Sequence, residues 1–455
     1  MDSRIVVVAN RLPVRWVEDR WETSPGGLVR ALVPILEERK GAWVGWGGVA
    51  GETIEPFGHA GIEQIPVALS DDDIDDFYFG FCNGTLWPLY HDAIASPDFH
   101  RHWWRAYERV NRRYAEAVAD VLDPEGVAWV QDYQLQLAPG FIRELIPSAK
   151  IGFYLHIPWP PVELFSRLPW RAEILRGLVA ADVVAFQTRR SAENFTRCVR
   201  RYLGGVPKAQ GTIDVGGRTV RVQRAPIGID VDEFNQLAVS PEIQDRATRL
   251  REDLGKPERL ILGVDRLDYT KGIDVRLKAV DTLLAMSGDQ PDRYAFVQVA
   301  VPTREEVPAY KDLRERVEGM VGRINGEYAR PGWSPVHYLH RSIPLDDLVT
   351  YYVAADIMLV TPLRDGMNLV AKEYVACRPD NDGVLILSEF AGAAENMRSA
   401  LLVNPHDVDQ VATTLQNAVE MEPEEIESRM RSLKKTVKRE DVYRWARVCL
   451  SALEA

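Results

Sequence analysis

The segment of residues 361–373, TPLRDGMNLVAKE, has the residue types and spacing of an anion-binding site. The stretch before it, residues 356–361, is apolar almost throughout, as is typical of a strand covered on both faces. Gly366 then gives the backbone freedom to turn into a helix. The amides of residues 367–369 are expected to be unpaired, and with the positive end of the helix dipole behind them they favour a diphosphate.

Two carboxylates bracket this predicted anion site. Asp365 precedes the turn and Glu373 lies eight residues later, which on a helix is two turns and about 80° of rotation. Carboxylates repel phosphate but accept hydrogen bonds from hydroxyls. The pair therefore suits a sugar on one side of a diphosphate and a ribose on the other. The simpler alternative is a helix N-terminus with routine capping, a common arrangement in α/β proteins.

Three basic residues follow two other apolar strands. Arg266 and Lys271 flank a tight turn before a helical stretch, and Arg304 takes the same position after the next strand. Cations at the carboxyl edge of a sheet are what a leaving diphosphate requires, because they stabilise the charge that grows as the glycosidic bond breaks. The neighbours Asp265 and Asp268 keep an alternative open, in which these cations form surface ion pairs.

The first strand of the chain ends at Arg11, and a loop with Gly26 and Gly27 follows before a helix. In parallel sheets ligands collect beyond the carboxyl ends of strands, so Arg11 is expected to point into a crevice. Paired glycines let the backbone approach a ligand closely. Alternatively, the Gly-Gly pair forms an ordinary turn before a helix and binds no ligand.

His156, Asp132, Tyr78 and Trp87 are further candidates in the first half of the chain. His156 ends an apolar strand before a proline-stiffened loop, and Asp132 also ends a strand. Aromatic faces and one carboxylate make a shelf for a sugar. The same aromatic residues equally make a hydrophobic core, and a lone histidine is more often structural than catalytic.

Composition narrows the classes of function. With 455 residues, 46% of them hydrophobic, the chain is too long for one ordinary core, so two domains are expected. The net charge of −12 argues against nucleic acid as a partner. The four cysteines are dispersed, without the spacing of a metal site, and the start of the chain does not resemble a signal peptide. No apolar run approaches a membrane span. The dispersed cysteines fit a reducing compartment best, so a cytoplasmic location is expected.

Strands alternate with helices throughout, which predicts an α/β fold with two doubly wound parallel sheets. The predicted strands of the first series are residues 4–9, 42–46, 127–131, 151–155, 182–186 and 220–227. Those of the second are residues 259–264, 295–301, 336–339, 356–361, 384–388 and 401–403. The predicted domains are residues 1–235 and 236–436, and a final helix over residues 437–455 is expected to cross back to the first domain.

Together these motifs resemble the trehalose-6-phosphate synthases, which are retaining nucleotide-sugar glycosyltransferases. The resemblance covers nearly the whole chain, through VVVANR (6–11), LWPLYH (86–91), QDY (131–133), HIP (156–158), VDRLDYTKG (264–272), RINGEY (323–328), TPLRDGMNLVAKE (361–373) and FAGA (390–393). It implies the GT-B fold, two Rossmann-like domains with the active site in the cleft between them. It further implies transfer of glucose from a nucleotide-glucose to glucose 6-phosphate.

The resemblance also assigns roles to the matching residues. The implied binding residues for glucose 6-phosphate are Arg11, Tyr78, Trp87, Asp132 and Arg304, and they place the acceptor mainly on the first domain. The implied donor-binding residues are Gly27, Gly366, Met367, Asn368, Leu369, Val370 and Glu373, the last holding the ribose. The implied catalytic residues are His156, Arg266, Lys271 and Asp365, which hold the donor sugar and its diphosphate. Neither a cofactor nor a metal is implied, because cations and a helix dipole occupy the role of a metal.

The residues agree with the family on one mechanistic point. A retaining glycosidase uses two carboxylates about 5 Å apart, one of which attacks the anomeric carbon. Here Asp365 and Glu373 are better assigned to hydroxyls. The resemblance implies instead that the acceptor hydroxyl attacks from the face on which the nucleotide leaves, with the leaving phosphate as base.

Several alternatives remain. A pseudo-glycosyltransferase would join a nucleotide-linked cyclitol to an amino-cyclitol phosphate on the same fold. A nucleotide-sugar 2-epimerase would leave Arg11 and Arg304 without a second phosphate, and a non-enzymatic sugar-phosphate sensor would be expected to lack Asp365 or Lys271. The base of the nucleotide is open between UDP and GDP, since Arg341, in a stretch that starts at His340, suits a two-pronged contact with guanine. Whether the chain forms a homo-oligomer is also open.

Overall fold

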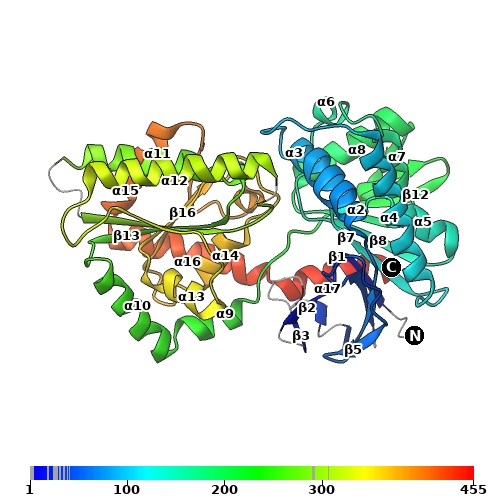
Figure 1. Ribbon diagram of the computed structural model, residues 1–455, viewed down its shortest axis with the longest axis horizontal. Coiled ribbons are helices and arrows are strands. Elements are labelled where there is room, and N and C mark those ends of the chain that lie inside the picture. Colours follow the sequence, from blue (N-terminus) through cyan, green and yellow to red (C-terminus); the bar gives the residue numbers. More distant parts are fainter. Residues whose placement is uncertain are drawn as a thin grey trace. The chain divides into compact units, whose positions relative to one another are not determined.

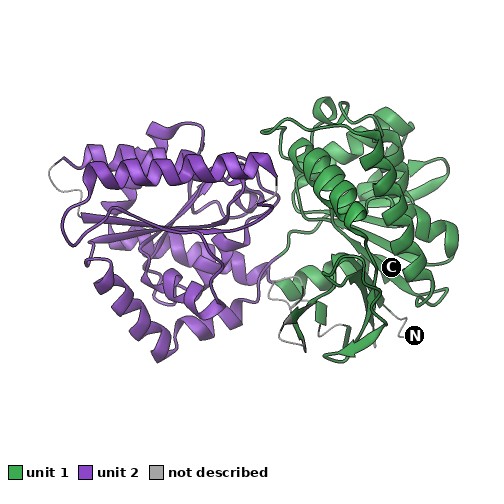
Figure 2. Cartoon of the chain, in the orientation of Figure 1, with its two compact units in different colours: residues 1–227, 442–455 green, residues 228–441 purple. Residues whose placement is uncertain are grey.

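The computed structural model describes residues 5–17, 20–23, 29, 32–33, 36–37, 39, 41–288, 293–305 and 307–454. The chain forms two compact units (Figures 1 and 2). Unit 1 comprises residues 1–227 and 442–455, and unit 2 comprises residues 228–441. The change of unit at residue 228 lies a few residues before the predicted 235, and the return at residue 442 lies a few residues after the predicted 437.

The described part of unit 1 contains a ten-stranded sheet with the order β10-β11-β12-β9-β8-β7-β1-β4-β6-β5. The strands are β1 (Ile5–Arg11), β4 (Ala42–Trp46), β5 (Phe57–His59), β6 (Ile62–Pro66), β7 (Val127–Gln131), β8 (Lys150–Leu155), β9 (Val183–Phe186), β10 (Val206–Lys208), β11 (Thr212–Val215) and β12 (Arg218–Arg224). From β12 to β6 all neighbours are parallel. The chain runs outward in opposite directions from β1 and β7, so the topological switch point lies between these two strands.

A separate hairpin and several helices complete the described part of unit 1. The hairpin pairs β2 (Val14–Val17) with β3 (Arg20–Thr23). The helices are α2 (Asp71–Asp73), the π-helix η1 (Ile74–Leu86), α3 (Trp87–Tyr90), α4 (Arg101–Ala119), η2 (Tyr133–Leu135), α5 (Ala138–Leu145), α6 (Val162–Phe165), α7 (Arg171–Val179), α8 (Arg189–Leu203), η3 (Ala209–Gly211) and α17 (Val442–Glu454). Helix α17 packs on the unit 1 sheet, since the Trp445 ring lies 5.2 Å from that of Trp129 and 5.1 Å from that of Tyr154.

Unit 2 contains a six-stranded parallel sheet with the order β15-β14-β13-β16-β17-β18. The strands are β13 (Arg259–Arg266), β14 (Tyr294–Val301), β15 (Val336–Leu339), β16 (Ile357–Val360), β17 (Val384–Ser388) and β18 (Leu401–Val403). Numbered within the unit, this is the order 3-2-1-4-5-6 of a Rossmann-like sheet. Its switch point therefore lies between β13 and β16.

The helices of unit 2 cover both faces of its sheet, which explains why the strands are apolar without alternation. They are α9 (Val231–Ala238), α10 (Pro241–Asp253), η4 (Tyr269–Lys271), α11 (Ile273–Met286), α12 (Pro308–Tyr328), α13 (Leu345–Ala354), α14 (Leu369–Ala376), η6 (Gly392–Glu395), α15 (Val408–Val419) and α16 (Pro423–Arg439). Figure 1 shows α11, α12 and α15 over one face and α13, α14 and α16 over the other. Buried residues of α11, α12 and α15 share one core with the strands, among them Leu277, Val317, Leu415 and Phe296.

Every strand predicted from the sequence occurs, with ends shifted by at most three residues. The prediction missed the hairpin β2–β3 and the strands β5, β6, β10 and β11. These are short, and β10 is exposed along its length, so neither a buried run nor an apolar alternation marks it. Among the described residues, no helix combines the length and the apolar character that crossing a bilayer requires.

Candidate active site

Lys271 and Asp365 meet at the switch point of unit 2. Lys271 ends the short helix η4 beyond β13, and Asp365 lies on the loop beyond β16. The Lys271 Nζ atom lies 2.6 Å from Oδ2 of Asp365, and the two side chains are only 11% and 13% exposed. Lys271 thus pairs across the switch point rather than with Asp265 or Asp268, the neighbours that the sequence offered as alternatives. A cation and a carboxylate lie together at the edge where ligands of such sheets bind.

The loop before α14 bends at Gly366, where the sequence placed the turn, and Asn368 directly precedes the helix. Asn368 has a left-handed φ of 86° and caps the helix, because its side chain accepts a hydrogen bond from the Ala371 amide at 3.1 Å. Its amide nitrogen also donates to Asp365 at 3.2 Å. The Met367 amide donates to Oδ1 of Asp365 at 3.4 Å, so this amide is not unpaired as predicted. The Asp365 carboxylate therefore accepts hydrogen bonds from two other residues of this loop.

The loop is also hydrogen-bonded to the segment that follows β17. The Asp365 amide donates to the Phe390 carbonyl at 3.2 Å, and the Gly392 amide donates to the Asp365 carbonyl at 3.1 Å. The Ala393 amide donates to the Met367 carbonyl at 2.8 Å. The FAGA segment, residues 390–393, thus holds the candidate anion loop in place through backbone hydrogen bonds. Leu369 and Val370 then form the first turn of α14.

Glu373 is held by a tyrosine that sequence analysis did not find. The Tyr352 hydroxyl donates to Oε2 of Glu373 at 2.7 Å. Burial, together with the Glu373 carboxylate, raises the pKa of Tyr352 well above its ordinary value. The hydroxyl therefore stays protonated and keeps donating. Only the sheet order brings α13 next to α14, so no local pattern marks this contact.

A buried network lies beneath the site. Arg276 is 0% exposed, and its Nη1 donates to Asp265 at 2.5 Å and to Gln298 at 2.8 Å. Its Nε donates to the Thr361 hydroxyl at 3.0 Å. A Cβ at Gly263 would lie 2.5 Å from both Nη1 of Arg276 and Oε1 of Gln298, so only glycine fits there. The network joins β13, β14 and the end of β16, the three strands that carry the candidate residues of unit 2.

Arg304 follows β14 in a strained conformation, with a φ of 50°. Its Nη1 contacts the Tyr310 hydroxyl at 2.5 Å and Oδ2 of Asp268 at 3.4 Å. Asp268 thus pairs with Arg304. Arg266 ends β13 with an exposed side chain. The three candidate cations of unit 2, Arg266, Lys271 and Arg304, therefore have different surroundings.

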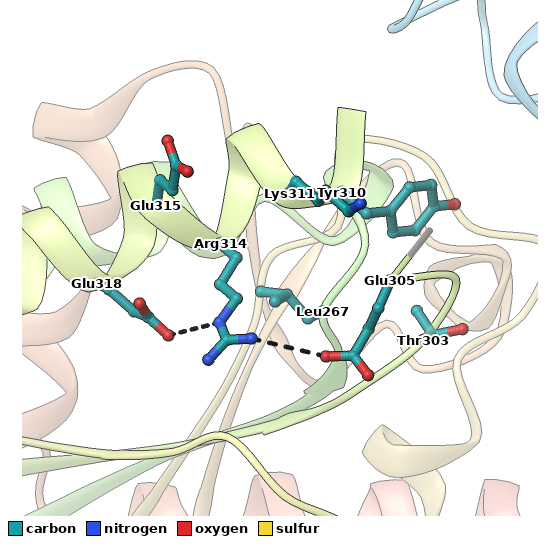
Figure 3. Close-up of a pocket in the computed structure, with 8 residues that line it drawn as sticks. All are labelled: Leu267, Thr303, Glu305, Tyr310, Lys311, Arg314, Glu315 and Glu318. Atoms are coloured by element: carbon teal, nitrogen blue, oxygen red, sulfur yellow. Dashed lines mark hydrogen bonds and ion pairs between the residues drawn. The ribbon is translucent and has the colours of Figure 1, made fainter. Parts of the chain in front are cut away.

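A hollow of about 440 Å³ lies beside Arg304 on unit 2. It is lined by Leu267, Thr303, Glu305, Tyr310, Lys311, Arg314, Glu315 and Glu318 (Figure 3). Figure 3 shows the Arg314 guanidinium between Glu305 and Glu318. Its lining therefore mixes both signs of charge.

Arg11 and Asp132 flank the switch point of unit 1, at the ends of β1 and β7. The Arg11 guanidinium lies 4.7 Å from the centre of the Trp46 ring on β4. A Cβ at Gly45 would lie 2.5 Å from the Arg11 carbonyl carbon, so this glycine permits β4 to approach the end of β1. The sheet thus places a cation and a carboxylate at this edge too.

Asp132 has a left-handed φ of 69°. Its amide donates to the Tyr154 carbonyl at 2.8 Å, and its Oδ1 accepts from the His156 amide at 3.1 Å. Three of the candidate residues that follow strands, Asp132, Arg304 and Asn368, thus have a positive φ, which non-glycine residues rarely adopt. Such strain persists only where the surrounding structure imposes it, and it often marks functional sites.

His156 contacts Gln131 through one ring nitrogen. Its Nε2 lies 3.0 Å from Oε1 of Gln131, whose amide nitrogen faces the Trp129 carbonyl at 3.5 Å. Burial lowers the pKa of His156, and the Asp132 charge offsets this only in part. The imidazole is therefore neutral at pH 7, with its proton placed on Nε2 and Nδ1 left as an acceptor. Gln131 orients the ring, and sequence analysis missed it although it stands next to Asp132.

Tyr78 lies on the π-helix η1, and Trp87 is the first residue of α3, which follows it directly. Trp87 is 4% exposed, and its ring lies 4.1 Å from that of His91 and 5.7 Å from that of Tyr133. Tyr78 is half-buried, and its ring lies edge-on to Phe79. Trp87 is thus packed as a core residue, whereas Tyr78 is more accessible. Gly27 lies outside the described residues.

The lowered pKa of His156 predicts acid sensitivity. Below pH 6.5 the unfolded chain binds a proton at this histidine that the folded chain takes up only at lower pH. The free energy of unfolding should therefore fall as the pH drops from about 6.5 towards the folded pKa. His156→Asn removes this contribution, so its melting temperature should fall less between pH 7.5 and 5.5 than that of the wild type. Equal falls in both proteins would contradict the prediction.

Known proteins are similar to this chain in sequence and in architecture. The model of glycosyltransferase family 20 matches residues 3–455. The trehalose-6-phosphate synthase of Mycolicibacterium smegmatis is 52% identical, with 100% of this chain and 93% of the relative covered. The Burkholderia xenovorans α,α-trehalose-phosphate synthase (UDP-forming), solved with glucose-6-phosphate, is 35% identical with a TM-score of 0.92, covering 99% of this chain and 100% of the other.

A solved Escherichia coli structure bound with UDP-2-fluoro glucose is likewise 35% identical, with a TM-score of 0.92 and 99% of both chains covered. These likenesses confirm the family resemblance that the motifs indicated. They also confirm the GT-B fold class, an α/β fold with two Rossmann-like domains.

Proposed function

The chain belongs to glycosyltransferase family 20, and on that premise we propose that it is an α,α-trehalose-phosphate synthase. It transfers glucose from a nucleotide-glucose to the 1-hydroxyl of glucose 6-phosphate and forms α,α-trehalose 6-phosphate and a nucleoside diphosphate. The observation that carries the proposal is the contact of 2.6 Å between Lys271 and Asp365 at the switch point of unit 2. This contact brings together Lys271, a cation suited to a diphosphate, and Asp365, a carboxylate suited to a sugar hydroxyl.

On the donor side, Lys271 exchanges Asp365 for the diphosphate when the nucleotide-glucose binds. Asp365 is then available to accept from a hydroxyl of the donor glucose, and Asn368 keeps it in place. Arg266 supplies a second cation. Glu373, oriented by Tyr352, accepts from the ribose. Fixed cations at a leaving group act most strongly when charge develops in the transition state.

On the acceptor side, Arg11 and Arg304 bind the phosphate of glucose 6-phosphate. Arginine suits this task because its planar fork of donors matches phosphate oxygens. Asp132 accepts from a hydroxyl of the acceptor, supported by the His156 amide at 3.1 Å. His156 holds the donor glucose through its neutral ring. Tyr78 offers an aromatic face to the acceptor sugar, and the buried Trp87 packs within unit 1 near this sugar site.

The transfer proceeds with retention by attack on the face from which the nucleotide leaves. The bond from the anomeric carbon to the diphosphate oxygen breaks, and a bond from that carbon to the acceptor oxygen forms. The proton of the acceptor hydroxyl passes to the leaving phosphate oxygen. Asp365 is engaged with Lys271, Asn368 and the Met367 amide, which supports hydroxyl binding rather than the nucleophilic role of a glycosidase carboxylate.

UDP-glucose is the donor we propose first, since two of the similar solved proteins are described with UDP as product or ligand. GDP-glucose is the second candidate, because Arg341 follows β15 and can contact guanine O6 and N7. The ring of the neighbouring His340 lies parallel to that of Tyr338, with centroids 6.2 Å apart. A pseudo-glycosyltransferase remains the alternative activity on the same fold.

One assay tests the proposal. The protein is incubated with glucose 6-phosphate and either UDP-glucose or GDP-glucose, and nucleoside diphosphate and disaccharide phosphate are measured by chromatography. The anomeric proton couplings in the product's NMR spectrum report retention. We expect α,α-trehalose 6-phosphate in equal amount to the nucleoside diphosphate released. Release of diphosphate without disaccharide, or no turnover with either donor, would refute the assignment.

A further inference from the structure

Asp268 is a buried carboxylate on the loop that carries Arg266 and Lys271. It is 0% exposed, and both of its oxygens are engaged. Oδ1 accepts from the Thr270 amide at 2.9 Å and from the Thr270 hydroxyl at 2.8 Å. Oδ2 accepts from the Tyr310 hydroxyl at 3.0 Å and from Nη1 of Arg304 at 3.4 Å. One oxygen therefore fixes its own loop, and the other reaches the residues after β14.

The carboxylate stays ionised at neutral pH. Burial by itself would raise the pKa of Asp268, but Arg304, Arg266, Lys271 and the Thr270 amide outweigh that effect and lower the pKa to about 2. The positive charges of three cations thus all stabilise this one carboxylate, and Arg304 contacts it directly. A fully buried charge is tolerated only with such partners and hydrogen bonds, and Asp268 has both.

Arg304 depends on this carboxylate for its orientation. Its side chain is 4% exposed and its backbone has the strained φ of 50°. The Tyr310 hydroxyl donates to Asp268 and accepts from Nη1 of Arg304, which closes a triangle of three contacts. A guanidinium carries five N–H donors in one plane. Contacts at Nη1 therefore fix the plane in which the remaining donors lie.

We propose that Asp268 is a positioning residue that aims Arg304 at the phosphate of the acceptor and ties it to the loop of the diphosphate cations. The inference rests on the proposed function in one respect, that Arg304 binds this phosphate. Asp268 itself touches no substrate. It links the loops after β13 and β14, so the acceptor arginine and the cations Arg266 and Lys271 keep one fixed arrangement.

The test compares the Michaelis constants of the two substrates in Asp268→Asn, which keeps the size and removes the charge. We expect KM for glucose 6-phosphate to rise about three- to tenfold, KM for the nucleotide-glucose to stay within about twofold, and kcat to change little. The matched control is Asp281→Asn, since Asp281 also pairs with an arginine, Arg323 at 2.7 Å, but on the surface of the same unit. Both KM values of the control should stay unchanged.

A double-mutant cycle separates positioning from a merely structural role. If Asp268 acts through Arg304, the double variant Asp268→Asn/Arg304→Ala should have the same KM for glucose 6-phosphate as Arg304→Ala alone. The inference would be overturned if the two substitutions raised KM for glucose 6-phosphate by independent factors that multiply in the double variant. It would also be overturned if Asp268→Asn raised both KM values equally. If Arg304→Ala alone leaves KM unchanged, it is the proposed role of Arg304 that fails. That result is distinguishable from the others.

Tyr310→Phe keeps the inference testable if the Asp268 variant does not fold. It removes one hydroxyl from the triangle and leaves the carboxylate in place. We expect KM for glucose 6-phosphate to rise about two- to threefold, in the direction of Asp268→Asn, with KM for the donor unchanged. An unchanged KM for glucose 6-phosphate in a folded Tyr310→Phe protein would contradict the positioning role.

Discussion

Lys271→Ala is expected to lower kcat by about tenfold or more. Its ammonium group lies at the switch point of unit 2, 2.6 Å from Asp365. When the diphosphate departs, negative charge grows on its oxygens, and a fixed cation stabilises that charge more in the transition state than in the ground state. KM for the nucleotide-glucose should change less than kcat. Steady-state kinetics with saturating glucose 6-phosphate provide both values.

The fold should survive this substitution, because Asp365 keeps Asn368 and the Met367 amide as partners. The matched control is Lys208→Ala, which removes a lysine paired with Asp214 at 3.0 Å on the surface of unit 1. Exposed ion pairs contribute little to stability, and this one lies outside the candidate site, so kcat of the control should equal that of the wild type. A folded Lys271→Ala protein with unchanged kcat would show that Lys271 does not stabilise the leaving group.

Arg304→Ala is expected to raise KM for glucose 6-phosphate far more than KM for the nucleotide-glucose. Loss of a charge-assisted hydrogen bond to a phosphate costs roughly 1.5–3 kcal/mol, which corresponds to a factor of about 10 to 100. The donor contacts of Lys271 and Asp365 do not involve this side chain. The measurement is a pair of saturation curves, each at a saturating concentration of the other substrate.

Arg323→Ala serves as the control for Arg304→Ala. Arg323 lies on α12 of the same unit and pairs with Asp281 at 2.7 Å, with its side chain 52% exposed. Its loss should leave both Michaelis constants unchanged. If Arg304→Ala weakened both substrates equally, Arg304 would belong to the donor side or to the general architecture of the site. The acceptor assignment would then pass to Arg11 alone.

The apolar runs in the sequence are enough to locate the predicted strands and the residues that end them. A parallel sheet covered on both faces requires nearly continuous apolar strands, and such runs stand out in any single sequence. Polar residues directly after these runs, such as Arg11, Asp132 and Arg266, are then placed at the carboxyl edge by the direction of the strands alone. The short strands β2, β3, β5, β6, β10 and β11 were not found by this reasoning because none of them contains a continuous apolar run.

The contacts among these side chains, in contrast, depend on how the strands are arranged in the folded chain. Lys271 pairs with Asp365, 94 residues away, instead of with an aspartate in its own loop. Asp265 instead neutralises the buried Arg276, and Glu373 receives the hydroxyl of Tyr352. The physical reason is the order of the strands. The chain builds β14 and β15 on one side of β13 and then returns to place β16 on the other. The two loops that share a switch point are therefore neighbours in space and distant in sequence.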